Sequence, residues 1–225
     1  MLRLCDSGVL EDSCQGILSR SGGDRRHVDP QKQPTSIDRI ALAPEPVARF
    51  RGPTSPDGAI TLMLSDIADA ASIARRIGPD RWEQLLRDHR LLVEQLVASY
   101  KGQVTKIDGD GFVASFHSAH ACLHAAVELN RAFASEIASG VDGGTVALRI
   151  GLHSGFVIPN PDQPQGRNFV LAARIAGQAR AGEILVSSSL KQYTERDRRL
   201  RFEPYGEYHF KGLVGEHTIY AVSPR

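Results

Sequence analysis

The chain has 225 residues, of which 41% are hydrophobic and 24% charged, as in an ordinary folded globular protein. Its formal net charge of +1 gives no support for a nucleic-acid partner or a membrane surface, and no apolar run is long enough to predict a transmembrane segment. The N-terminus lacks the apolar core of a signal peptide, and the three cysteines form neither an even disulfide set nor a metal-binding spacing. We therefore expect a reduced, cytoplasmic protein.

The first part of the chain differs in composition from the rest. Half of the 12 prolines lie in the first 58 residues, among glycine, serine and charges of both signs. Such a composition is typical of linkers. We expect residues 1–57 to form a proline-rich, largely disordered extension, with at most a short helix around residues 37–42. Residues 58–225 should then form the folded domain.

The elements of this domain begin with a short apolar run at residues 60–64, which has the length of a buried strand. A short helix is expected at residues 70–77, and Gly78-Pro79-Asp80 then marks the start of another. Apolar residues recur at helical spacing from Trp82 to Tyr100, which predicts a long amphipathic helix.

The remaining elements alternate between strands and helices. Two strands, at residues 103–107 and 112–116, are joined by a tight Asp-Gly turn. After them the pattern predicts a helix at 119–137, a strand at 146–152, a helix at 169–179, a strand at 184–187 and a strand pair at 202–211 and 218–222. This order predicts an α+β fold, in which helices cover one face of an antiparallel-rich sheet and a strand pair ends the chain.

Two aspartates indicate metal-assisted chemistry. Asp66 follows an apolar strand, and Asp110 lies in the glycine turn, four residues after Lys106. Carboxylates at the ends of buried strands are costly unless a positive charge compensates them, and a divalent cation does so well. Asp66 could instead cap the following helix, since aspartate is common at that position.

Other polar residues in the same region have simpler explanations. Asp108 suits the Asp-Gly turn itself, and no further oxygen ligands follow at the spacing of a calcium loop. His153 is expected to be a hydrogen-bonded core histidine, and Cys122 to belong to the apolar face of a helix. We assign neither a role in the chemistry.

Six short motifs occur in order between residues 59 and 223. They are Leu64-Ser65-Asp66-Ile67, Lys106-Ile107-Asp108-Gly109-Asp110-Gly111-Phe112, Arg149-Ile150-Gly151-Leu152-His153-Ser154-Gly155, Ala172-Ala173-Arg174-Ile175, Gly182-Glu183-Ile184-Leu185-Val186-Ser187 and Gly206-Glu207-Tyr208-His209-Phe210-Lys211-Gly212. Together they resemble the class III nucleotidyl cyclase catalytic domain. The resemblance implies a ferredoxin-like βααββαβ core.

The resemblance also implies a reaction, in which a nucleoside triphosphate cyclises to its 3',5'-monophosphate and releases pyrophosphate. In the family two divalent cations, Mg or Mn, are held between the positions of Asp66 and Asp110. It further implies a homodimer whose active sites are shared. The partner chain would supply Lys106 to the base, Arg174 to the α-phosphate and Lys211 to the triphosphate. A lysine only donates hydrogen bonds, which suits N1 of adenine and favours ATP.

The sequence departs from the family at two positions. An asparagine usually stands four residues before the catalytic arginine, where this chain has Val170. The nearby Asn168 is two residues away along a helix and therefore points elsewhere. The base-reading partner of the lysine is usually an aspartate; here the corresponding position is Gln163, with Asp162 beside it. A glutamine can face either purine.

These observations leave three hypotheses. The first is an adenylate cyclase of reduced rate, either a homodimer or a heterodimer with a chain that supplies the missing asparagine. The second is a catalytically impaired domain that binds nucleotide or regulates a partner, and Val170 favours it. A guanylyl cyclase is the third, because Gln163 leaves that selectivity open.

Overall fold

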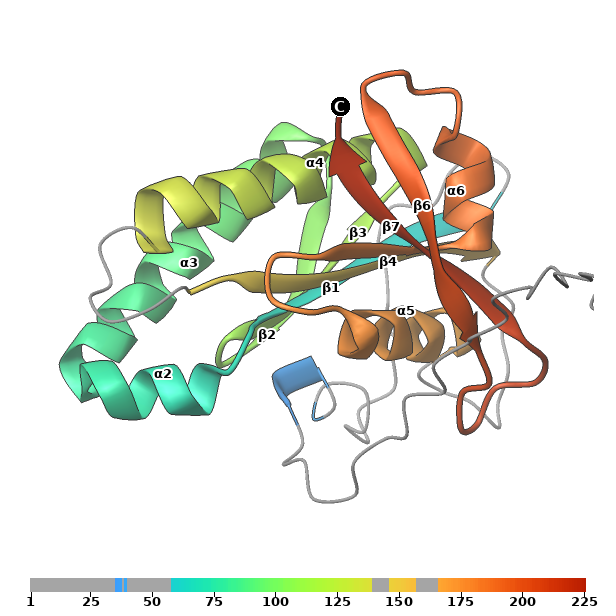
Figure 1. The fold of residues 1–225 in the computed structure, drawn as a ribbon. Coiled ribbons are helices and arrows are strands. Elements are labelled where there is room, and N and C mark those ends of the chain that lie inside the picture. Colours follow the sequence, from blue (N-terminus) through green and yellow to red (C-terminus); the bar gives the residue numbers. More distant parts are fainter. Residues whose placement is uncertain (1–34, 38, 40–57, 139–145, 157–165) are drawn as a thin grey trace, which may run out of the picture.

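The computed structural model describes residues 35–37, 39, 58–138, 146–156 and 166–225. One sheet of seven strands, in the order β2-β3-β1-β4-β5-β7-β6, forms its centre (Figure 1). The strands are β1 (Ala59–Ile67), β2 (Gln103–Asp108), β3 (Gly111–Phe116), β4 (Leu148–Phe156), β5 (Ile184–Ser187), β6 (Leu200–Tyr208) and β7 (His217–Pro224). The helices are α2 (Ala70–Ile77), α3 (Pro79–Ser99), α4 (Ala119–Ala132), the π-helix η2 (Phe133–Ile137), α5 (Arg167–Gln178) and α6 (Ser188–Thr194).

The strand pairing confirms the predicted α+β class. All neighbouring strands are antiparallel except β4 and β5, which are parallel. The chain reaches β5 from β4 through α5, as a parallel connection requires. β6 and β7 form the predicted C-terminal strand pair, and they extend the sheet at the β5 edge.

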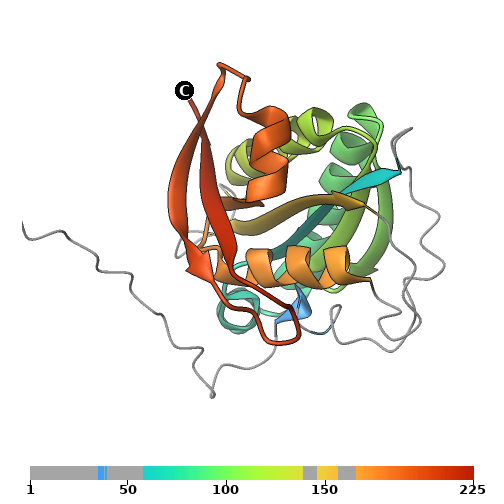
Figure 2. The same ribbon diagram turned by 90° about the vertical axis from the view of Figure 1, so that its right-hand side faces the viewer.

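Helices cover both faces of the sheet, whereas the sequence pattern predicted one covered face. Figures 1 and 2 show α3, α4 and α6 on one face and α5 on the other. Strand β1 shows why, because its side chains alternate between two cores. Met63 packs with residues of α3 and α4, while Leu62 and Leu64 pack with residues of α5. A strand that is buried on both sides gives a continuous apolar run, so the run alone did not reveal the second layer.

Small residues let α5 approach the sheet closely. A Cβ at Gly151 of β4 would lie 2.3 Å from the backbone nitrogen of Ala176, so no larger residue fits there without a shift. Ala172, Ala173 and Ala176 of α5 are all buried, and they pack in one core cluster with residues of β1 and β3. The position of α5, which carries Arg174, is therefore fixed by backbone-to-backbone packing.

Two local features were not predicted. The chain forms helix α6 directly after β5, where the Ser187 hydroxyl accepts a hydrogen bond from the Leu190 amide at 3.3 Å. The predicted helix at 119–137 is α4 followed by the π-helical turn η2. Among the described residues, no helix combines the length and the apolar character needed to cross a bilayer.

Part of the N-terminal extension also packs on the domain. Ser36, Ile37 and Arg39 are helical, and the Arg39 amide donates to the Thr35 carbonyl at 3.0 Å. Ile37 is 1% exposed and lies in the core between the sheet and α5. We refer to residues 35–37 and 39 as the N-terminal turn. The rest of residues 1–57 lies outside the described residues.

Candidate active site

Asp66 lies at the end of β1, with its side chain fully buried. The register of β1 and β4 places Arg149 directly opposite. Arg149 Nε donates to Asp66 Oδ1 at 2.8 Å, and the guanidinium NH2 donates to Oδ2 at 2.5 Å. This bidentate ion pair compensates a carboxylate that would otherwise be costly to bury. The N-cap of α2 is Asp69, so the interpretation of Asp66 as a helix cap is wrong.

Asp110 lies beside Asp66, on the neighbouring strand connection. Its Oδ2 accepts a hydrogen bond from the backbone amide of Ile67, the residue after Asp66, at 3.3 Å. Asp110 is only 7% exposed. The antiparallel pairing of β1 with β3 therefore brings two aspartates that are far apart in the sequence to neighbouring strand ends.

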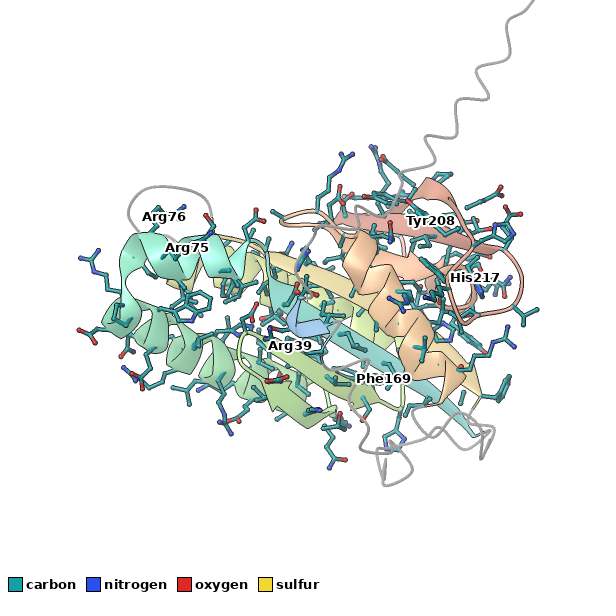
Figure 3. The ribbon with its side chains drawn as sticks, turned by 90° about the horizontal axis from the view of Figure 1, so that it is seen from below. Arg39, Arg75, Arg76, Phe169, Tyr208 and His217 are labelled. Carbon is teal, nitrogen blue, oxygen red and sulfur yellow. The ribbon has the colours of Figure 1, made fainter. Side chains whose placement is uncertain are left out.

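The N-terminal turn contacts the same carboxylate. The Ser36 hydroxyl donates to Asp110 Oδ1, and the Arg39 NH2 donates to Ser36 Oγ at 2.7 Å. Figure 3 shows the turn that carries Arg39 between the β2–β3 hairpin and α5. Arg39 Nε also lies 3.9 Å from an oxygen of Asp108, in an ion pair that is about half-exposed. Asp108 otherwise pairs with Gly111 across the hairpin, which fits its predicted role in the turn.

Lys106 lies on β2, an edge strand of the sheet. It lines a cavity of about 540 Å³ between β2 and helix α3, together with Arg87, Arg90 and Glu94. This cavity is open and charged. Lys106 shares the β2–β3 hairpin with Asp110, as the motif predicted.

Arg174 and Lys211 are both associated with α5. Arg174 is partly buried on this helix. Lys211 is exposed and follows Phe210, which packs in a cluster with Leu171 and Ile175 of α5. A hydrogen bond from Arg167 to the Val214 carbonyl, at 3.0 Å, anchors the same loop to the start of α5. Within one chain, Lys106 and Lys211 thus stand at opposite edges of the sheet.

Asn168 does not replace the asparagine that is missing at Val170. Its Oδ1 lies 3.2 Å from His153 Nε2, and its Nδ2 donates to the Phe156 carbonyl at 2.7 Å. His153 Nδ1 lies 2.9 Å from the Ser187 hydroxyl. Burial lowers the pKa of His153 to about 4, so the ring is neutral at physiological pH. The expectation of a hydrogen-bonded core histidine is confirmed, as is the burial of Cys122. Gln163 and Asp162 lie outside the described residues.

The residues around Asp66 and Asp110 have the donors that a magnesium or manganese ion prefers. Carboxylate oxygens are hard ligands, and Asp110 accepts the amide of the residue that follows Asp66. An ionised carboxylate offers about four lone-pair positions, so Arg149 does not saturate Asp66. The described residues contain no group of three or more His, Cys, Asp or Glu side chains placed to bind a metal.

Two residues of this site received no individual role from the sequence. Arg149 lies in a recognised motif, and only the register of β1 against β4 reveals that it faces Asp66. Ser36 lies 74 positions before Asp110 in a segment expected to be loosely attached. An arginine inside an otherwise apolar strand was a signal for the first residue. No local pattern indicates the second.

The fold and the paired aspartates define a nucleotidyl cyclase catalytic domain. The model of the family described as "Adenylate and Guanylate cyclase catalytic domain" matches residues 53–224, and the chain belongs to this family. "Putative adenylate cyclase 3" of Rhizobium meliloti (strain 1021) is 26% identical over 145 residues, covering 64% of this chain and 24% of that protein. An uncharacterized protein of Mycobacterium tuberculosis (strain ATCC 25618 / H37Rv) is 27% identical over 137 residues, covering 60% of this chain. The chain spans less than half the length of either relative.

Solved structures show the same fold. The adenylyl cyclase CyaB from P. aeruginosa has a TM-score of 0.65 at 20% identity, with 74% of this chain and 94% of that chain covered. The guanylyl cyclase Cya2 has a TM-score of 0.63 at 20% identity, with 74% and 92% covered. Because one is an adenylyl and the other a guanylyl cyclase, the shared fold does not select between ATP and GTP.

Proposed function

We propose that this chain is an adenylate cyclase that converts ATP to 3',5'-cyclic AMP and pyrophosphate. The observation that supports the proposal is the hydrogen bond from the amide of Ile67, the residue after Asp66, to the Asp110 carboxylate. Family membership supports the reaction class, and the relative from Rhizobium meliloti is described as a putative adenylate cyclase. A cytoplasmic location, where ATP is available, is part of the proposal.

In the reaction the ribose 3'-oxygen attacks the α-phosphorus, its proton leaves, and the bond from the α-phosphorus to the pyrophosphate oxygen breaks. Two divalent cations held by Asp66 and Asp110 would help to activate the 3'-hydroxyl and neutralise charge on the pyrophosphate. Arg174 would stabilise the charge that develops on the α-phosphate, and Lys211 would bind the triphosphate. Lys106, a donor only, would recognise N1 of adenine, with Gln163 as a second contact to the base.

We propose that two chains share each site. Asp66 and Asp110 would come from one chain, and Lys106, Arg174 and Lys211 from its partner. Among solved relatives, a guanylyl cyclase domain from Blastocladiella emersonii is described as dimeric, and adenylate cyclases from Trypanosoma brucei are described in their monomeric state.

The second candidate function is a nucleotide-binding or regulatory domain without turnover. Val170 favours it, because this residue stands one turn before Arg174 on α5 and has no side-chain donor or acceptor. Asn168 is already bonded to His153 and Phe156. Loss of one preorganised transition-state contact typically lowers a rate by roughly 10²–10³. Val170→Asn should therefore raise the rate, and an unchanged rate would mean that the ribose is held in another way.

The deciding experiment measures product formation by the purified chain with ATP or GTP, in Mn²⁺ and separately in Mg²⁺. Asp110→Asn serves as the blank, because it keeps the size of the side chain and removes its charge. We expect cyclic AMP above the blank. Cyclic GMP instead would overturn the interpretation of Lys106. No product from a folded dimer, with either nucleotide, would favour the regulatory function.

A further inference from the structure

The N-terminal turn occupies one of the two carboxylates that the reaction needs. The Ser36 hydroxyl donates a hydrogen bond to Asp110 Oδ1, and Ser36 itself is 3% exposed. The Arg39 guanidinium reaches Ser36 Oγ at 2.7 Å and lies near Asp108. The Ser36 hydroxyl and the Ile67 amide thus each take one oxygen of Asp110, and the Arg39 cation lies next to Ser36.

The turn is held mainly by an apolar anchor. Ile37 is almost fully buried against Leu62, Leu64 and Val113 of the sheet and Ala173 of α5. The Arg39–Asp108 ion pair has side chains that are 52% and 43% exposed, so solvent screens it. Burial of a whole isoleucine side chain contributes more than such a pair. Ile37 therefore fixes the turn, and Ser36 couples its position to Asp110.

We propose that the N-terminal turn is a built-in block of the metal site, which must leave Asp110 before a divalent cation binds there. The inference rests on the proposed role of Asp110 as a metal ligand. Metal binding and docking of the turn then compete for one carboxylate. The apparent affinity for the metal is then the intrinsic affinity multiplied by the fraction of molecules in which the turn is undocked.

The test uses the full chain and Mn²⁺ alone, without nucleotide. Free Mn²⁺ is measured by electron paramagnetic resonance during a titration of wild type, Ile37→Glu, Ser36→Ala and Asp110→Asn. Leu91→Glu is the matched control, because it places the same charge on an apolar residue that is 56% exposed on α3. Hydrogen exchange of peptides covering residues 35–39 is followed in wild type with and without Mn²⁺.

We expect Ile37→Glu to bind Mn²⁺ about tenfold more tightly than wild type, as when the docked state outnumbers the open one by about that factor. Ser36→Ala should also bind more tightly, and Leu91→Glu should match wild type. Mn²⁺ should increase hydrogen exchange at the Arg39 amide, which donates to Thr35 in the docked turn. If Ile37→Glu does not fold, Ser36→Ala and the exchange measurement decide.

Equal Mn²⁺ affinity in wild type and Ser36→Ala, with exchange at residues 35–39 unchanged by Mn²⁺, would overturn the proposal. Weaker binding in Ser36→Ala would do the same, since Ser36 would then assist the metal. Mn²⁺ binding that is unaffected by Asp110→Asn would refute the metal site itself. If the competition is found but no variant forms product, the block is upheld and the cyclase activity is rejected.

Discussion

Asp66 and Asp110 are in different environments, although both are candidate ligands for the same metal ions. Asp66 is compensated by Arg149 from the opposite strand, whereas Asp110 accepts a backbone amide and the Ser36 hydroxyl. Removal of Asp66 would leave the buried Arg149 without this partner. Asp110→Asn is therefore a cleaner test of catalysis than any change at Asp66.

Arg149→Met should lower the free energy of unfolding by about 3–5 kcal/mol, because it removes the bidentate guanidinium partner of the buried Asp66 carboxylate. Urea unfolding monitored by circular dichroism measures this loss. The double variant Asp66→Leu with Arg149→Met is the control. It replaces both charges by apolar groups and should recover most of the stability. A double variant as unstable as Arg149→Met would show that packing of the arginine, and not charge compensation, is responsible.

His89 provides a pH prediction. It is buried between the rings of Phe112 and Phe133, its Nε2 has no hydrogen-bond partner among the described residues, and burial lowers its pKa to about 4. The unfolded histidine titrates near pH 6.5, so between pH 6.5 and about 4 only the unfolded state takes up the proton. The contribution of His89 to the free energy of unfolding should fall by about 1.4 kcal/mol per pH unit as the pH decreases through that window.

His153 also lowers the free energy of unfolding as the pH decreases, since its pKa is likewise lowered to about 4. The pKa of His217 is lowered as well, so His89→Leu should remove about 1.4 kcal/mol per pH unit from a slope to which other histidines also contribute. Urea unfolding at a series of pH values between about 7 and 4 measures both slopes. An unchanged slope in His89→Leu would mean that the buried ring does not govern the acid sensitivity.

At the scale of elements, α5 determines the geometry of the site because it carries Arg174 and Val170 and packs directly on β4. Gly151→Ala should push this helix away from the sheet, since the new Cβ would lie 2.3 Å from the Ala176 nitrogen. We expect a loss of about 2 kcal/mol or more in unfolding free energy. Gly177→Ala is the matched control on α5. A Cβ there meets nothing within 4 Å, and the substitution should stabilise the helix by up to about 1 kcal/mol.

Thermal and urea unfolding measure the stability of the Gly151→Ala and Gly177→Ala variants, and product formation is measured in parallel. Gly151→Ala should lose activity as well, because displacement of α5 moves Arg174. Wild-type stability and activity in Gly151→Ala would show that the β4–α5 contact is adaptable. The sequence predicted the helix itself, but the closeness of this contact depends on the register of β4 beneath it.

At the scale of the whole molecule, the proposal that two chains share each site makes a complementation prediction. An equimolar mixture of Asp110→Asn and Arg174→Ala chains should regain activity that neither variant has alone. If chains pair at random, about a quarter of the sites combine an intact Asp110 with the partner's intact Arg174, so about a quarter of wild-type activity is expected. Activity no higher than the sum of the separate variants would mean that each site lies within one chain.

The sequence by itself determined the local elements, the α+β class and the residues of the motifs. Helical spacing in α3, the Asp-Gly turn at Asp108 and the ordered motifs are encoded within short stretches, where steric and hydrogen-bonding preferences act locally. His153 was also correctly predicted as a core residue, although its partners Asn168 and Ser187 were not.

Only the tertiary structure decided how these stretches meet. The register of β1 placed Arg149 against Asp66, the packing of β1 with β3 placed Asp110 beside Ile67, and the apolar core under α5 held Ile37. Each of these contacts joins residues far apart in the chain and depends on which strand lies next to which. Successive side chains of β1 point to opposite faces of the sheet, and both faces are buried. The strand is therefore one continuous apolar run, from which the second helical layer could not be predicted. The side of the sheet that bears α5, and with it the contact of Ser36 with Asp110, follows from packing rather than from local preference.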